Sequence, residues 1–286
     1  MDHVEHAATA RAPDGTAPDA PPRRSRRRSG AWILAGCIAV IAMLAVGIHL
    51  IEWDGPPATL EGRPAAPRAA EPPAAASTTE PRYPVPVPPQ PEALPALAGS
   101  DAFVQHALES VVGAQGMKLL RLDGALRRFV ATVDGLPRPG PLPRLLPMRP
   151  PQGPFVVNRS ATGTVLDTSN ERRYAPYVWL VEAVDPKLAV ALYARLYPLL
   201  QQQYRELGYP SGEFNDRVVH AIDDLLAAPD AADAMPLAQP NVLYQFADPA
   251  LEALSAGQKL MLRIGPHNEA RIKARLQALR SALLPV

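Results

Sequence analysis

One uncharged apolar stretch constrains this 286-residue chain more than any other feature. Residues 31–51 read AWILAGCIAVIAMLAVGIHLI, and no second run of this kind occurs in the sequence. As a helix, these 21 residues would be about 31 Å long, which matches the hydrocarbon core of a bilayer. We therefore expect residues 31–51 to form a transmembrane helix and the chain to cross a membrane once.

The flanks of this stretch predict its direction. The residues after it include Glu52 and Asp54, whereas five arginines precede it: Arg23, Arg24, Arg26, Arg27 and Arg28. Because positive flanks stay on the cytoplasmic side, residues 1–30 are predicted to be a disordered basic tail in the cytoplasm, and everything after Trp53 lies outside. A cleaved signal peptide and lipidation at Cys37 are alternatives, but the apolar run is long for the first and continues beyond Cys37.

Two features inside the apolar stretch suggest further roles. Small residues lie on one stripe at a spacing of four: Ala31, Ala35, Ala39 and Gly47, with Met43 between the last two. Such a stripe allows close helix packing and a homodimer, although alanine is abundant throughout this chain. His49 lies near the outer end, where an interfacial position and a proton-relay role are both open.

Proline divides the rest of the chain. Of its 35 prolines, 17 fall in residues 1–98, and residues 82–91 alternate proline with other residues almost continuously. This composition favours extended polyproline II structure rather than a globule. We expect residues 52–98 to be a Pro/Ala-rich linker, acting as a spacer or as a docking strip for a partner.

Residues 99–286 have the periodicity of a helix-rich domain with a minor β element, an α+β fold. Asp185-Pro186 and Asp248-Pro249 each combine a capping carboxylate with proline at the first helical position. Residues 136–154 are predicted to form a proline-rich loop. The predicted helices cover about 100–113, 119–133, 185–207, 212–228, a short segment after 249, 257–265 and 268–284. The predicted strands are a hairpin of 155–157 with 163–166, and residues 242–247.

Several stretches of this domain are typical of one family. They are 127–138 (RRFVATVDGLPR), 197–200 (YPLL), 214–216 (FND) with 222–226 (IDDLL), 244–249 (YQFADP) and 258–266 (QKLMLRIGP). Over about residues 94–284 the chain resembles a family of uncharacterised bacterial single-pass membrane proteins, catalogued as a domain of unknown function. The resemblance implies a shared fold and an envelope location, here the inner membrane with a periplasmic domain. It implies no activity and no catalytic residue.

The clearest polar cluster for chemistry is His220 with Asp223 and Asp224, which share a predicted helix at spacings of three and four. They are our candidate polar site, and a solvated helix face is the alternative. One histidine without a second is a weak metal site, and the domain has neither a cysteine nor a G-x-S-x-G elbow. We predict no catalytic residue, metal or cofactor, and we lean against an enzyme.

Charge is distributed unevenly along the domain. The net charge of the whole chain is only +1, which excludes a nucleic-acid binder acting by bulk charge. Residues 99–205 carry 13 basic and 8 acidic residues, 206–252 carry 1 and 9, and 253–286 carry 6 and 1. The stretch 135–166 has no acid and four arginines: Arg138, Arg144, Arg149 and Arg159.

These arginines are our candidate surface for an anionic headgroup or an acidic partner, because guanidinium groups pair well with phosphate and carboxylate. The alternative is internal counter-charge, with Lys259 and Arg263 as natural partners of the acidic segment. We expect an inner-membrane adaptor or scaffold that binds an envelope protein. An envelope hydrolase or ligand-binding domain, and a component of an energy-transducing complex that uses His49, are the other hypotheses.

Overall fold

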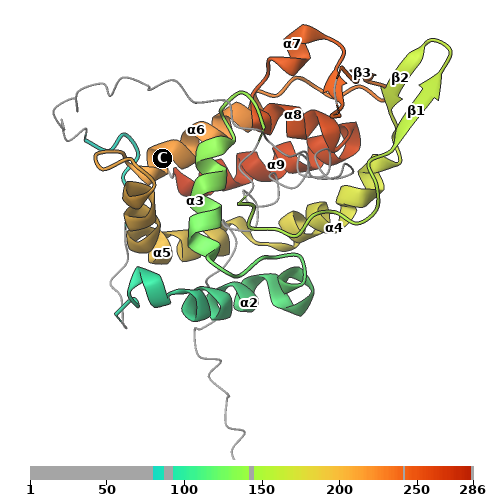
Figure 1. Ribbon diagram of the computed structural model, residues 1–286. Helices are drawn as coiled ribbons and strands as arrows, with labels where there is room; N and C mark the ends of the chain where they lie inside the picture. The colour runs from blue at the N-terminus through green and yellow to red at the C-terminus, as the bar shows by residue number, and fades with distance from the viewer. Residues whose placement is uncertain (1–79, 87–92, 142–144, 241, 285–286) are drawn as a thin grey trace, which may run out of the picture. The chain divides into compact units, whose positions relative to one another are not determined.

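The computed structural model describes residues 80–86, 93–141, 145–240 and 242–284 (Figure 1). These residues are mostly helical, with one small antiparallel sheet, which confirms the expected α+β class. The predicted tail, the transmembrane helix with its small-residue stripe, and His49 lie outside the described residues. No helix within the described ranges is long and apolar enough to cross a membrane.

Helices α3, α5, α6 and α9 pack around the main core. Phe214 of α6 lies at its centre, with its ring 5.9 Å from that of Phe129 on α3 and 6.5 Å from that of Tyr193 on α5. All three side chains are almost fully buried. The bounds of these helices are Ala125–Gly135 for α3, Pro186–Glu206 for α5, Phe214–Leu226 for α6 and Pro266–Leu283 for α9.

Local capping explains where several helices begin. The Asp185 carboxylate accepts a 2.8 Å hydrogen bond from the backbone N–H of Lys187 at the start of α5, which continues through Pro198. Asp248 caps the short helix α7 (Pro249–Glu252) in the same way. Both starts follow the Asp-Pro pattern and confirm the prediction. Helix α8 (Ala256–Arg263) begins with a capping box between Ser255 and Gln258.

The predicted helix over 119–133 is wrong in its first turn. Helix α3 begins only at Ala125, after Gly124, which adopts a left-handed conformation (φ 60°). Leu120 pairs instead with Met148, and the backbone N–H of Arg121 donates to the carbonyl of Pro147 at 2.8 Å. The backbone before α3 therefore anchors the proline-rich loop. Helix α2 (Asp101–Met117) is broken at the predicted stop, because Gly113 has non-helical backbone angles (φ 63°, ψ 177°), and a second helical piece follows this kink.

Helix α4 (Asn170–Ala183) has no counterpart among the predicted elements. Pro176 lies inside it, and its aromatic and charged residues do not form one clear apolar stripe. Its buried side chains include Tyr177, Val178 and Leu180, and it packs against α9 and α2. Tertiary packing therefore overrides a weak local signal.

The sheet has the strand order β1-β2-β3-β4, all antiparallel. The strands are β1 (Val157–Ser160), β2 (Gly163–Leu166), β3 (Pro236–Ala238) and β4 (Gln245–Phe246). The hairpin is confirmed, although β1 starts two residues later than expected; β3 was not predicted, and β4 is shorter than the predicted strand 242–247. Figure 1 shows the sheet near α7 and α8, and Leu262 of α8 joins the small core beneath it.

Gly265, at the start of α9, packs against Glu171 in the first turn of α4. Its φ is 87°, and a Cβ at this position would collide with the side chain of Glu171. The backbone carbonyl of Glu171 also accepts a 2.9 Å hydrogen bond from the Asn268 side chain. This contact fixes the first turn of α4 against α9.

Gly265→Ala should lower the free energy of unfolding by about 2 to 4 kcal/mol, because backbone strain and displacement of Glu171 add. The matched control is Gly208→Ala, where φ is also positive (117°) but the Cβ would meet open space. The control should cost only about 1 kcal/mol. Urea unfolding of both variants measures the difference, and equal losses would show that the Glu171 contact is unimportant.

Candidate functional site

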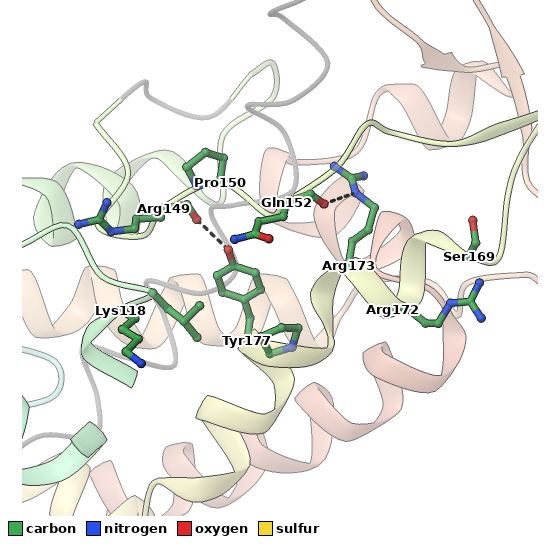
Figure 2. A pocket seen from close by; sticks show the side chains of 10 residues that line it. Lys118, Arg149, Pro150, Gln152, Ser169, Arg172, Arg173 and Tyr177 are labelled. Carbon is green, nitrogen blue, oxygen red and sulfur yellow. Dashed lines mark hydrogen bonds between the residues drawn. The ribbon is translucent and has the colours of Figure 1, made fainter. Parts of the chain in front are cut away.

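A pocket of about 570 Å³ lies between the end of α2, the loop around residues 149–152 and the first half of α4 (Figure 2). We call it the cationic pocket. Four of its lining residues carry positive charge and none carries a carboxylate. The residues that line it are Lys118, Leu119, Arg149, Pro150, Gln152, Ser169, Arg172, Arg173, Pro176 and Tyr177.

Tyr177 joins the helix side of the pocket to the loop side. Its hydroxyl donates a 3.0 Å hydrogen bond to the backbone carbonyl of Arg149. Burial raises the pKa of Tyr177 to about 12, so the phenol stays a neutral donor at physiological pH. The backbone N–H of Arg149 donates to the carbonyl of Leu119 at 2.8 Å, which ties the loop to the residues after α2.

Arg173 positions the rest of the loop. Its guanidinium donates to the backbone carbonyl of Gln152 at 3.4 Å, to that of Gly153 at 2.9 Å and to the side-chain oxygen of Asn170 at 3.1 Å. Each of its three nitrogens therefore has a protein acceptor. Arg173 contributes positive charge to the pocket, and its hydrogen bonds hold the loop in place.

The other three cations keep donors available. The Nε of Arg149 donates to the carbonyl of Leu120 at 3.3 Å, and its two terminal nitrogens have no hydrogen bond to another described residue. Arg172 is exposed, and its side chain makes no hydrogen bond within the described part of the chain. Lys118 donates to the side-chain oxygen of Gln115 at 3.1 Å, which leaves the rest of its ammonium free. These groups can bind an added anion without breaking an ion pair.

Figure 2 shows how these groups are arranged. Arg149 and Lys118 lie on one side of Tyr177, and Arg172 lies on the other, with its guanidinium pointing away from that of Arg149. Gln152 lies between them, beside the Tyr177 ring. The cations therefore occupy opposite ends of the pocket and do not converge on one point.

Asp167 is a carboxylate near the pocket rather than in its lining. The backbone N–H of Ser169 donates to it at 2.8 Å. Hydrogen bonding from Ser169 lowers the pKa of Asp167, and the charge of Arg172 lowers it further. Asp167 therefore stays ionised, and its acceptor capacity is partly used by the turn that leads into α4.

The arginines predicted as a surface for an anionic partner are separated in the structure. Only Arg149 lines the cationic pocket. Arg138 pairs with Asp134 at 2.8 Å, and Arg159 bonds the hydroxyl of Tyr244. Arg144 lies outside the described residues.

Sequence reasoning missed the other three cations of the pocket. Lys118 follows α2, and Arg172 and Arg173 lie in the unpredicted helix α4. Arg172 and Arg173 are neighbours in a stretch for which no helix or strand is predicted, and this pairing is the one sequence signal that points to them.

The candidate polar site is also divided between different partners. Asp223 pairs with Arg280 of α9 at 2.6 Å, and Asp224 accepts a 2.6 Å hydrogen bond from the Ser255 hydroxyl. His220 is exposed. Burial raises the pKa of Asp224. Within the described ranges, no group of three His, Cys, Asp or Glu side chains could hold a metal ion.

The acidic segment finds counter-charges in the C-terminal basic segment. Lys259 pairs with Glu252 at 2.9 Å, as expected, and Lys273 pairs with Asp230 at 2.9 Å. Arg263 is buried with its guanidinium 5.2 Å from the centre of the Phe246 ring. Internal pairing thus uses these charges, whereas the cations of the pocket have no such partner among the described residues.

The fold and the pocket together define a helix-rich α+β domain with an open cationic site. The family model described as "Protein of unknown function (DUF3014)" matches residues 125–280, which is more than half of the chain. The chain therefore belongs to this family, which confirms the expected resemblance to a domain of unknown function over these residues. No curated protein and no solved structure matches it.

Two neighbouring arginines test the structural role assigned to Arg173. Arg173→Gln should lower the free energy of unfolding by about 1 kcal/mol, because the carbonyls of Gln152 and Gly153 and the buried Asn170 side chain lose a charged donor. Arg172→Gln should change it by less than about 0.5 kcal/mol, since Arg172 is exposed and makes no such bonds. The urea unfolding midpoints of the two variants measure this difference, and equal midpoints would show that the Arg173 hydrogen bonds do not stabilise the loop.

Proposed function

We propose that this chain is a membrane-anchored adaptor whose folded domain binds an acidic segment of a partner protein in the cationic pocket. The observation that carries the proposal is a pocket lined by four cations and no carboxylate, with free donors on Arg149, Arg172 and Lys118. Guanidinium forks bind carboxylates bidentately, and arginine stays charged at every physiological pH.

The spacing of the cations favours an extended ligand. A single phosphate or carboxylate is best held by donors that converge on one point, whereas Arg149 and Arg172 lie at opposite ends of the pocket (Figure 2). A polypeptide with acidic side chains at intervals can reach both ends. The Gln152 amide, between the two ends, can donate to and accept from the backbone of such a segment.

Apolar surface supports a protein ligand as well. Leu119, Pro150 and Pro176 line the pocket, and Trp179 follows Pro176 by three residues along α4. Residues at this spacing share a helix face, and the Trp179 side chain is 48% exposed. Tryptophan and arginine are enriched where protein partners bind most strongly, so Trp179 extends the proposed contact surface beyond the pocket.

The rest of the chain suits an adaptor. The apolar stretch 31–51 is proposed as the anchor in a bacterial inner membrane, and the proline-rich segment after it as the spacer into the periplasm. The partner is proposed to be another envelope protein, which the domain reaches within the radius of this spacer. The small-residue stripe from Ala31 to Gly47 stays a proposal for pairing two anchors.

Binding of a short fluorescent peptide of alternating glutamate and glycine tests the pocket directly. Arg149→Glu combined with Arg172→Glu should weaken binding to the full-length protein at least tenfold, because both ends of the pocket then repel carboxylates. The matched control combines Arg127→Glu and Arg205→Glu, two exposed arginines outside the pocket. Fluorescence anisotropy at fixed salt should show near-normal affinity for the control.

Two outcomes would contradict the proposal. Equal weakening in both double variants would mean that only net charge matters. Binding of phosphatidylglycerol vesicles that requires Arg149 and Arg172, without binding of the acidic peptide, would assign the pocket to lipid headgroups instead. Either result would remove the adaptor role from the pocket.

A further inference from the structure

Part of the stretch expected to be linker lies against the folded domain. The backbone N–H groups of Arg82 and Tyr83 donate to the two carboxylate oxygens of Asp216, at 3.1 and 2.9 Å. The backbone carbonyl of Tyr83 accepts a 2.7 Å hydrogen bond from the side-chain amide of Asn215. Asp216, which accepts these bonds, and Asn215, which donates, both belong to the first turn of α6.

The partner groups on α6 are also held by contacts within the folded domain. Asn215 is only 1% exposed, and its side-chain oxygen accepts a 3.0 Å hydrogen bond from the buried hydroxyl of Tyr193. This bond fixes which end of the Asn215 amide faces Tyr83. A carboxylate in the first turn of a helix, such as that of Asp216, is also favoured by the helix dipole.

The segment itself bends at Arg82 and Tyr83, which lets two consecutive N–H groups face one carboxylate. Tyr83 and Val85, two residues apart, are both half-buried and pack against the main core. Pro84 and Pro86 have no N–H to satisfy and restrict the backbone that follows the bend. The site therefore reads a short bent backbone together with two apolar side chains.

We propose that residues 82–85 form a latch on α6, and that this latch moves the effective start of the tether from Leu94, which packs against the main core, to Arg82. The bound occupant is the chain's own segment. Closing the latch removes residues 86–93 from the tether, which amounts to roughly 25 Å of reach at full extension. The consequence for reach rests on the proposed membrane anchor, whereas the latch contact does not.

Amide hydrogen exchange of the full-length protein tests the contact cleanly. A peptide covering residues 81–86 contains three prolines, so its only backbone N–H groups belong to Arg82, Tyr83 and Val85. Arg82 and Tyr83 should exchange slowly, and Asp216→Ala should speed their exchange at least tenfold. Asp230→Ala is the matched control, because this carboxylate pairs with Lys273 and not with the latch.

A second variant tests the latch without a substitution inside a helix or strand. Arg82→Pro deletes one latch donor in a segment outside every helix and strand, so the domain should remain folded while Tyr83 exchanges several-fold faster. Fast exchange of Arg82 and Tyr83 in the unaltered protein would overturn the latch. So would exchange that neither Asp216→Ala nor Arg82→Pro accelerates.

Reach is measured by energy transfer from a dye on the domain to labelled lipids in vesicles that contain the full-length protein. A flexible insertion after Ala70 should lower transfer, whereas the same insertion after Gln90 should lower it only in Asp216→Ala. Equal lowering by both insertions in the unaltered protein would contradict the latch. If neither insertion has an effect while exchange stays slow, the latch holds and the proposed anchor fails.

Discussion

Burial of one face of α4 is the constraint on which the rest of the site depends. Tyr177, Val178 and Leu180 are inaccessible or nearly so, and each large apolar side chain buried in this way contributes about 1.5 to 3 kcal/mol. This packing against α9 and α2 holds in place a helix that contains an internal proline. From the same helix, Arg173 holds the 152–153 carbonyls and the Tyr177 hydroxyl holds the carbonyl of Arg149. Both walls of the cationic pocket are thus attached to α4.

Ion pairs elsewhere in the domain explain why the pocket stands out as positively charged. The acidic segment 206–252 is neutralised in part by Lys259, Lys273 and Arg280, which come from α8 and α9. Arg138 is likewise used by Asp134. The cations of the pocket form no ion pair among the described residues, although Asp167 lies near Arg172, so a chain of net charge +1 presents a locally positive site. A cleft lined by one sign of charge attracts ligands of the opposite sign.

Local patterns predicted the elements that are determined locally. The Asp-Pro starts of α5 and α7, the apolar stripe of α6 and the β1–β2 hairpin all follow from residues close in sequence. Helix α4 could not be predicted in this way, because Pro176 interrupts it and its stability comes from distant partners. The spacing of His220, Asp223 and Asp224 on one helix was right, but nothing local shows that Arg280 and Ser255 engage the two carboxylates.

Neither the cationic pocket nor the latch can be predicted from the sequence, because each is formed by residues that are far apart in the chain. Lys118, Arg149 and Arg172 come from three separate segments, and only the fold brings them to one place. Arg82 and Tyr83 bind Asp216 across more than 130 positions of sequence. Proline content correctly indicates that residues 82–86 form no helix or strand, but it predicts neither the bend at Arg82 and Tyr83 nor whether that backbone is free or bound.

The most direct test of the central claim is site-specific photo-crosslinking in cells from position 152, in the middle of the pocket. The full-length protein at its native level should give one reproducible product, crosslinked to an acidic segment of an envelope protein. Arg149→Glu with Arg172→Glu should abolish that product. A product that survives this charge reversal, a crosslinked segment without acidic residues, or no protein product where a known envelope complex is captured, would contradict the account.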